Sequence, residues 1–206
     1  FFISVQLLLW TVSGIYFAFN KIELVRGEQY RLTNFSDINL GEIDFDIPKT
    51  SNLQIKKRLD QTIIILSSDS GSSYLNSDGT ALDKISAEMA MLLVQQNTTL
   101  TPIEAEEIMS SKKGSEYRGR ALPLMKVKSK NEKDKLINVY LNIYSGEVTA
   151  IRSMQWKIWD VMWGFHIMDW QERDNIDNLF LKIFSILALV SSITGILLFF
   201  KIDFKK

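Results

Sequence analysis

Two long apolar runs, one at each end of the chain, constrain the fold more than any other feature. The run from Ile183 to Phe200 has no charged residue. At a helical rise of about 1.5 Å per residue, it nearly crosses a hydrocarbon layer of about 30 Å. The other run, residues 1–20, is also free of acids and bases. The sequence therefore predicts two transmembrane helices, over residues 1–20 and 179–200.

The segment between these runs has the composition of a folded domain. Residues 21–154 are mixed in polarity and long enough to bury a core. The chain has 24 basic and 24 acidic residues, so its net charge does not favour binding to nucleic acid. It has no cysteine, which excludes disulfides, thiolate metal sites and iron–sulfur clusters. We expect an extracytoplasmic domain over residues 21–154 and no metal site.

The first apolar run has two interpretations. A cleavable secretory signal also has a short apolar core. However, Trp10, Tyr16, Phe17 and Phe19 make a poor small-residue cleavage site and favour an uncleaved helix. The chain begins inside the run without a methionine or a basic flank. We therefore expect transmembrane helix 1 to be truncated at its N-terminus.

Charge near the second run predicts the orientation. Lys201, Lys205 and Lys206 follow this run, whereas residues 172–177 before it are rich in acids. Basic residues flanking a membrane span favour the cytoplasmic side. We expect residues 201–206 to form a cytoplasmic tail and the central domain to face the periplasm or the outside.

Residue periodicity predicts a compact α+β domain. β-Branched and alternating patterns predict strands at residues 43–47, 62–66, 73–76, 122–128, 136–144 and 148–151. Apolar residues at helical spacing predict a helix over residues 82–96. A second helix is predicted from Thr101, a capping residue, to about Met109, because Pro102 suits the first helical position and Glu104 the first turn.

Several phrases resemble the PepSY-associated transmembrane family of bacterial membrane proteins. In the central segment these are residues 101–108, 122–127 and 139–148, where Asn142 and Ser145 replace the usual Asp and Thr. At the ends they are residues 10–14, 163–169 and 194–195. The resemblance is best over residues 99–152. It implies a PepSY-like domain, made of a helix and an antiparallel sheet, between two helices in the bacterial inner membrane.

Four tryptophans mark residues 155–175 as a further helix. Trp156, Trp159, Trp163 and Trp170 recur at spacings of three, four and seven residues, which places them on one helical face. Indole rings favour the boundary between lipid and water. The pattern predicts an interfacial helix in contact with membrane lipid, and the alternative is a platform for haem or quinone.

His166 is the only histidine of the chain and the only candidate cofactor ligand. The resemblance extends to ferric or siderophore reductases, in which paired membrane histidines hold haem b. Such a haem needs an imidazole on each face, so the second would come from the missing N-terminal segment or from a partner in a homodimer. The alternative interpretation of His166 is a polar anchor in the interfacial helix.

No set of catalytic residues can be assembled from the sequence, since one histidine and no nucleophile motif are present. The leading hypothesis is a non-enzymatic binding or accessory module that contacts an extracytoplasmic protein through exposed strand edges, in iron uptake or a redox system. Two alternatives stay open. One is electron transfer through haem b bound at His166, and the other is a PepSY domain that regulates a protease.

Overall fold

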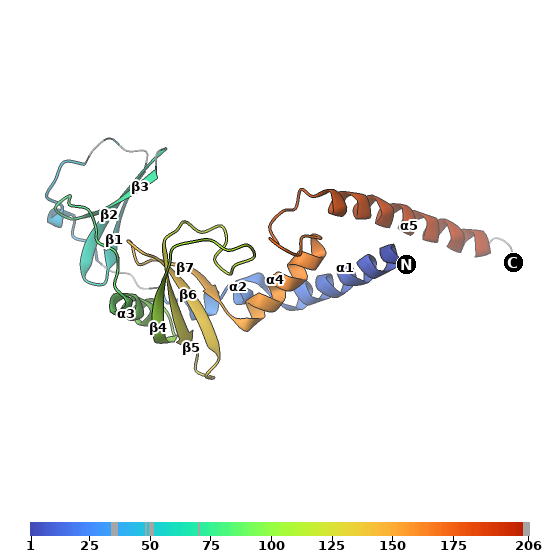
Figure 1. The fold of residues 1–206 in the computed structure, drawn as a ribbon, viewed down its shortest axis with the longest axis horizontal. Helices are drawn as coiled ribbons and strands as arrows, with labels where there is room; N and C mark the ends of the chain where they lie inside the picture. Colours follow the sequence, from blue (N-terminus) through green and yellow to red (C-terminus); the bar gives the residue numbers. More distant parts are fainter. Residues whose placement is uncertain (34–36, 48, 50–51, 70, 204–206) are drawn as a thin grey trace. The chain divides into compact units, whose positions relative to one another are not determined.

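The chain folds into two compact units. A computed structural model describes residues 1–33, 37–47, 49, 52–69 and 71–203. One unit contains both ends of the chain, Phe1–Val25 and Gln155–Lys206, and the other is Arg26–Met154. Helices at the two ends and antiparallel sheets in the middle confirm the predicted α+β class (Figure 1).

The terminal unit is helical. It contains α1 (Phe2–Phe19), α2 (Ile22–Val25), α4 (Met154–His166) and α5 (Leu179–Asp203). Both α1 and α5 are long and apolar enough to cross a membrane, and none of the 18-residue apolar window of α5 is buried. The start of α1 and the end of α5 lie at the same end of this unit (Figure 1). Lys205 and Lys206 of the predicted tail lie outside the described residues.

The Trp-rich helix is shorter than the predicted residues 155–175. α4 ends at His166, and Met168 adopts a left-handed φ of 56°. The chain then turns around Asp169, whose carboxylate accepts hydrogen bonds from the backbone N–H groups of Glu172, Asp174 and Asn175. These local bonds replace helical ones, because an Asp side chain competes with the helix for backbone donors.

The central unit contains two antiparallel sheets. The first has the order β1-β2-β3, with β1 (Asn52–Arg58), β2 (Gln61–Ser68) and β3 (Gly71–Asn76). The second has the order β4-β5-β6-β7, with β4 (Thr101–Ile108), β5 (Leu124–Lys130), β6 (Leu136–Asn142) and β7 (Val148–Arg152). The described residues of this unit also form one α-helix, α3 (Ala87–Asn97), and two 3-10 turns, Glu28–Tyr30 and Leu40–Glu42.

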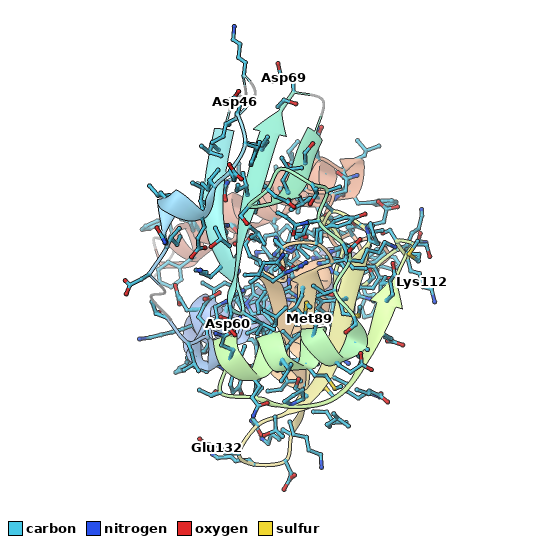
Figure 2. All side chains as sticks on the ribbon, turned by 90° about the vertical axis from the view of Figure 1, so that its left-hand side faces the viewer. Asp46, Asp60, Asp69, Met89, Lys112 and Glu132 are labelled. Carbon is cyan, nitrogen blue, oxygen red and sulfur yellow. The ribbon has the colours of Figure 1, made fainter. Side chains whose placement is uncertain are left out.

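The main core lies between α3 and one face of the four-stranded sheet. Strand alternation sends every second side chain of β5 and β6 towards the helix. The fully buried members of this core include Val94, Val127, Val139, Leu141 and Ile151. On the opposite face, Tyr117 packs on Leu124, Tyr140 and Ala150. Asp69 and Glu132, in the turns β2–β3 and β5–β6, lie at opposite ends of the unit (Figure 2).

The prediction of a helix from Thr101 to about Met109 was wrong, since this segment is strand β4. Glu104 and Glu106 lie directly opposite Lys128 and Lys126 of β5 and form ion pairs with them. These cross-strand pairs and the ladder to β5 outweigh the local helix signals. Pro102 is also compatible with an edge strand, because an edge residue needs no N–H for the ladder.

Two smaller predictions also needed correction. Residues 43–47 form no strand, and Pro48 at the end of that segment lies outside the described residues. The helix predicted from Leu82 begins at Ala87, because Ser86 Oγ accepts the N–H of Met89 as an N-cap. The remaining predicted strands overlap β2, β3, β5, β6 and β7.

The turn between β6 and β7 is tightly packed against α3. Asn142 Oδ1 accepts the backbone N–H groups of Tyr144 and Ser145, each at 2.9 Å. Gly146 follows with a left-handed φ of 72°, and a Cβ at this residue would lie 2.5 Å from Leu93 Cδ1. Glycine is therefore needed at this position for conformation and for space.

We predict that Gly146→Ala destabilises the central unit more than Gly119→Ala does. Both glycines have a φ near 70°, but nothing lies within 4 Å of a Cβ at Gly119. Gly119→Ala, the control, should lower the free energy of unfolding by about 1 kcal/mol, because alanine disfavours the left-handed conformation. Gly146→Ala should cost a further ~1–3 kcal/mol for overpacking. Hydrogen exchange of the β6 amides in the full chain measures the free energy of unfolding of each variant. An equal loss of stability in the two variants would contradict the close packing of Gly146 on Leu93.

Candidate functional site

The predicted cofactor ligand, His166, lies where α4 packs on α1. Side chains of α1 at spacings of four, three and four residues face α4, and they are Gln6, Trp10, Ser13 and Phe17. The helices run antiparallel, because Asn20 at the end of α1 accepts a hydrogen bond from Gln155 at the start of α4. The face of α1 towards α4 is thus partly polar.

Polar side chains of α1 donate hydrogen bonds to backbone carbonyls at the end of α4. Trp10 Nε1 donates to the carbonyl of His166 at 2.7 Å, and Gln6 Nε2 donates to the carbonyl of Phe165 at 3.3 Å. The last carbonyls of a helix have no partner within the helix. These two bonds therefore cap α4 from a neighbouring helix.

The hydrogen bonds of Ser13 indicate the tautomer of His166. Ser13 Oγ donates to the carbonyl of Trp10 at 3.1 Å and lies 2.8 Å from His166 Nδ1. A hydroxyl has one hydrogen, so we infer that Nδ1–H donates to Oγ and that Nε2 carries the lone pair. Among the described residues, Nε2 has no hydrogen-bond partner. Neutral imidazole with a free Nε2 is a form that binds metals.

Aromatic rings surround His166 on two sides. The indole of Trp163 stacks on the imidazole at 6.3 Å between centroids, and Phe17 approaches it edge-on at 5.6 Å. Trp159 in turn stacks on Trp163 at 5.5 Å. Burial among these groups lowers the pKa of His166 below its ordinary value. The imidazole is therefore neutral at pH 7.

The other two predicted interface residues lie apart from this cluster. Trp156 is buried on α4, with 8% of its surface exposed. Trp170 is 53% exposed and lies beyond the end of the helix. Of the four predicted interface tryptophans, Trp159 and Trp163 lie beside His166. The location of these tryptophans at a membrane interface stays a prediction.

A partly buried ion pair in the same unit was not predicted from the sequence. Asp160, on α4, is 1% exposed, and its Oδ2 lies 2.6 Å from Arg173 Nη1. Asn178 adds a second connection, since its Nδ2 donates to the carbonyl of Ile167 and its Oδ1 caps the N–H of Leu181. Together these bonds fix the loop from α4 to the start of α5. The sequence signal that could have indicated this ion pair is Asp160, a single acid in an apolar, Trp-rich segment.

A cleft of about 560 Å³ opens in the central unit. Four parts of the chain that are distant in the sequence contribute its walls: residues 31–33 with residue 38, and the segments around 55–59, 93–97 and 145–148. Its apolar lining includes Leu32, Ile38, Ile55, Leu59 and Val148. No sequence motif marks this cleft, because its walls meet only in the folded chain.

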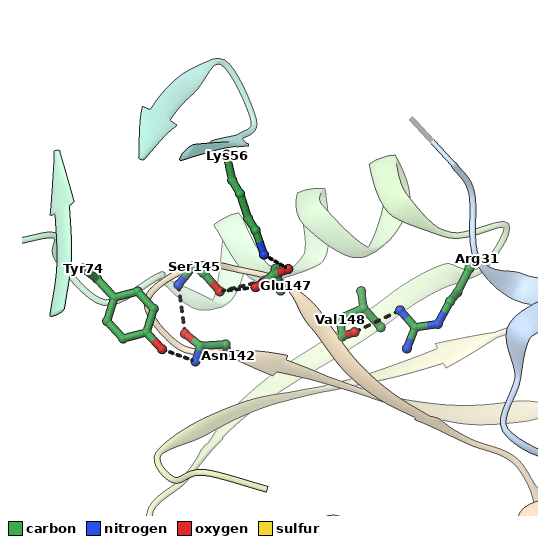
Figure 3. Close-up of polar contacts among 7 residues, drawn as sticks. All are labelled: Arg31, Lys56, Tyr74, Asn142, Ser145, Glu147 and Val148. Carbon is green, nitrogen blue, oxygen red and sulfur yellow. Dashed lines mark hydrogen bonds and ion pairs between the residues drawn. The ribbon is translucent and has the colours of Figure 1, made fainter. Parts of the chain in front are cut away.

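Polar contacts hold the first sheet against the β6–β7 turn (Figure 3). Lys56 Nζ lies 2.5 Å from Glu147 Oε1, and Tyr74 Oη accepts Asn142 Nδ2 at 3.0 Å. The buried Arg58 donates to the carbonyl of Tyr144 at 2.9 Å, and burial lowers the pKa of this arginine. Lys56 and Glu147 also line the cleft, so this ion pair lies on its wall.

The cleft is lined by three basic residues and one acidic residue. The bases are Arg31, Lys56 and Lys57, and the acid is Glu147. Arg31 Nη1 donates to the carbonyl of Val148 at 2.9 Å, which orients the guanidinium on the wall (Figure 3). Glu28 and Glu42 pair with Arg31 and Lys57 from outside the lining. The surface suits a ligand that is apolar in part and carries negative charge.

Among the described residues, no group of three His, Asp or Glu side chains lies close enough to hold a metal ion. Comparison with known proteins gives no match, whether with protein-family models, with curated proteins or with solved structures. Any functional proposal therefore depends on the geometry of the His166 cluster and of the cleft.

We predict that the terminal unit loses stability as the pH falls below about 6.5, the ordinary value for histidine. The folded state resists protonation of His166, because burial lowers its pKa, whereas the unfolded chain accepts the proton. Stability thus rises with pH between the folded and unfolded pKa values. Unfolding temperatures of the full chain in detergent between pH 5 and 8 test this. The unfolding temperature of His166→Asn should change less with pH than that of the wild-type chain. An identical pH dependence of the two proteins would contradict the prediction.

Proposed function

We propose that this protein is a non-enzymatic binding or accessory module of PepSY type, anchored in the bacterial inner membrane. In this proposal α1 and α5 span the membrane and the central unit lies on the extracytoplasmic side. There it binds a partner protein of an iron-uptake or redox system. The observation that carries the proposal is the cleft of about 560 Å³ with its mixed apolar and basic lining.

Packing in the terminal unit supports an anchor of two helices. The apolar side chains of α5 are exposed along its length, and such a surface needs lipid or protein to cover it. α1 donates two hydrogen bonds to the end of α4. Cleavage of α1 as a secretory signal would leave those carbonyls without partners, so its packing favours an uncleaved helix.

The arrangement of α3 and the second sheet supports the PepSY-type assignment. The resemblance implies a helix that leads into an antiparallel sheet, and α3 precedes β4-β5-β6-β7. The support is partial, because residues 101–108, the phrase expected to form that helix, are strand β4. One phrase of the resemblance, residues 139–148, covers the end of β6 and the turn that contributes Ser145, Gly146 and Glu147 to the cleft. In this proposal the family phrase therefore contributes one wall of the binding site.

We predict that a photo-crosslinking amino acid at Leu32 or Ile38 captures one discrete extracytoplasmic protein in cells. Both side chains line the cleft and are 43% and 39% exposed. The matched control is the same amino acid at Glu132, in the β5–β6 turn, which is exposed and does not line the cleft. Adducts with the same protein from all three positions, or from none, would contradict a specific binding surface in the cleft.

A second candidate function is electron transfer through haem b, favoured by the free Nε2 of His166. The Ser13 hydroxyl would hold the ring from Nδ1, as is usual for a histidine that binds a metal. A bound haem would supply one-electron chemistry. The chain has one histidine, so a second imidazole must come from another chain or from residues outside this sequence.

The haem hypothesis predicts a reducible b-type absorption spectrum of the full chain purified from haem-replete cells. His166→Ala should abolish the spectrum, because the only imidazole is removed. Ser13→Ala is the matched control, since it keeps the ligand and removes only its hydrogen-bond partner. It should retain the spectrum with a changed reduction potential. A featureless spectrum of the folded wild-type protein would reject the hypothesis.

A further inference from the structure

The outer edge of β1 has unpaired backbone groups. A two-residue turn joins β1 to β2, so the flanking pair Arg58 and Gln61 exchanges both ladder hydrogen bonds. The bonded pairs then alternate along the strand, which directs the N–H and C=O groups of Leu53, Ile55 and Lys57 away from β2. Among the described residues, none of these groups has a backbone partner.

Two of the other edge strands, β3 and β4, carry features that hinder pairing. On β3, Tyr74 O accepts the N–H of Leu82, and the N–H of Asn76 donates to Thr80 O. β4 contains Pro102 and a bulge, and its Glu104 and Glu106 side chains are 62% and 64% exposed. Proline, bulges and exposed charges are the usual means by which proteins keep an edge from pairing.

The two lysines of β1, Lys56 and Lys57, hinder strand pairing less than the exposed charges of β4 do. The side chains of Lys56 and Lys57 are 32% and 18% exposed, and ion pairs with Glu147 and Glu42 hold them against the unit. Ile55, Lys56 and Lys57 also line the cleft, so the open edge and the cleft are one continuous surface. A strand added to β1 would therefore place side chains in the cleft.

We propose that the edge of β1 and the adjoining cleft bind an extended, acidic peptide segment of the partner protein as an additional antiparallel or parallel strand. Backbone hydrogen bonds to Leu53, Ile55 and Lys57 give the segment its register. Its alternate apolar side chains contact the apolar lining of the cleft, and its carboxylates approach Arg31, Lys56 and Lys57. This inference rests on the proposed binding function and specifies the partner's chemistry.

Charge complementarity favours an acidic segment over a neutral or basic one. The lining has three bases and one acid. The external partners Glu28 and Glu42 have side chains that are 49% and 44% exposed. Exposed ion pairs contribute little to stability, so a ligand carboxylate can replace these glutamates at low cost.

The first test uses a fluorescein-labelled peptide of seven alternating valine and glutamate residues and the full chain in mild detergent. Fluorescence anisotropy should detect binding. A version with lysine in place of glutamate should bind at least about tenfold more weakly, since like charges oppose docking. A glutamate version with a methyl group on every backbone nitrogen should also lose binding, because it has no N–H left to donate to a strand edge. Absence of binding by the first peptide, or equal binding by all three, overturns the inference.

Variants of the protein locate the contact. Ile55→Pro removes an outward N–H, which an edge strand tolerates, and should abolish peptide binding. Ile55→Val is the matched control that keeps the N–H and should bind normally. Lys56→Gln should weaken binding of the acidic peptide, whereas Glu147→Gln frees Lys56 and should strengthen it. Effects of Lys56→Gln and Glu147→Gln in the same direction would indicate a structural role and reject a carboxylate contact.

The cellular crosslink separates this inference from the proposed function. A partner that is captured at Leu32 equally well with Ile55→Pro and with Ile55→Val would reject pairing with β1 and leave the binding module intact. Peptide pairing without any cellular adduct would support the edge site and reject the accessory role.

Discussion

The packing of α1 on α4 depends on hydrogen bonds from side chains to the exposed end of a helix. Trp10 and Gln6 satisfy the carbonyls of His166 and Phe165, and Ser13 holds the imidazole. An unsatisfied carbonyl in an apolar environment costs several kcal/mol, on the order of a whole domain's net stability. Gln6, Trp10 and Ser13 in the otherwise largely apolar α1 are therefore explained by their contacts with α4, and they fix which face of α1 turns towards that helix.

A similar principle organises the central unit. The β6–β7 turn has backbone carbonyls that no strand satisfies, and the buried Arg58 of β1 donates to one of them, at Tyr144. The stacked rings of Tyr74 and Tyr144 and the Lys56–Glu147 pair add to this contact. The first sheet is thus held to the second by a turn, and the space left beside that turn is the cleft.

Sequence patterns predicted the elements whose signals are local or continuous. The β-branched run 62–66 lies within β2, and the apolar runs form α1 and α5. Thr101–Ile108 was mispredicted because Thr, Pro and Glu satisfy helix-start rules, while the lysines that pair with its glutamates lie 20 and 24 residues later, in β5. His166 and the tryptophans were visible as unusual residues. Their partners on α1 and the entire cleft were not, since both depend on contacts between distant segments.

The two functional hypotheses make different demands on the chain and do not compete for the same atoms. An anchoring role for His166 uses Nδ1 and the backbone carbonyl, whereas a haem would use Nε2. Binding in the cleft uses β1 and the turn after β6, which belong to the other unit. The proposed binding in the cleft and the proposed haem binding at His166 are therefore compatible in one protein. Loss of one proposed function in a variant of one unit gives no information about the other, because the residues invoked for each proposal lie in different compact units of the chain.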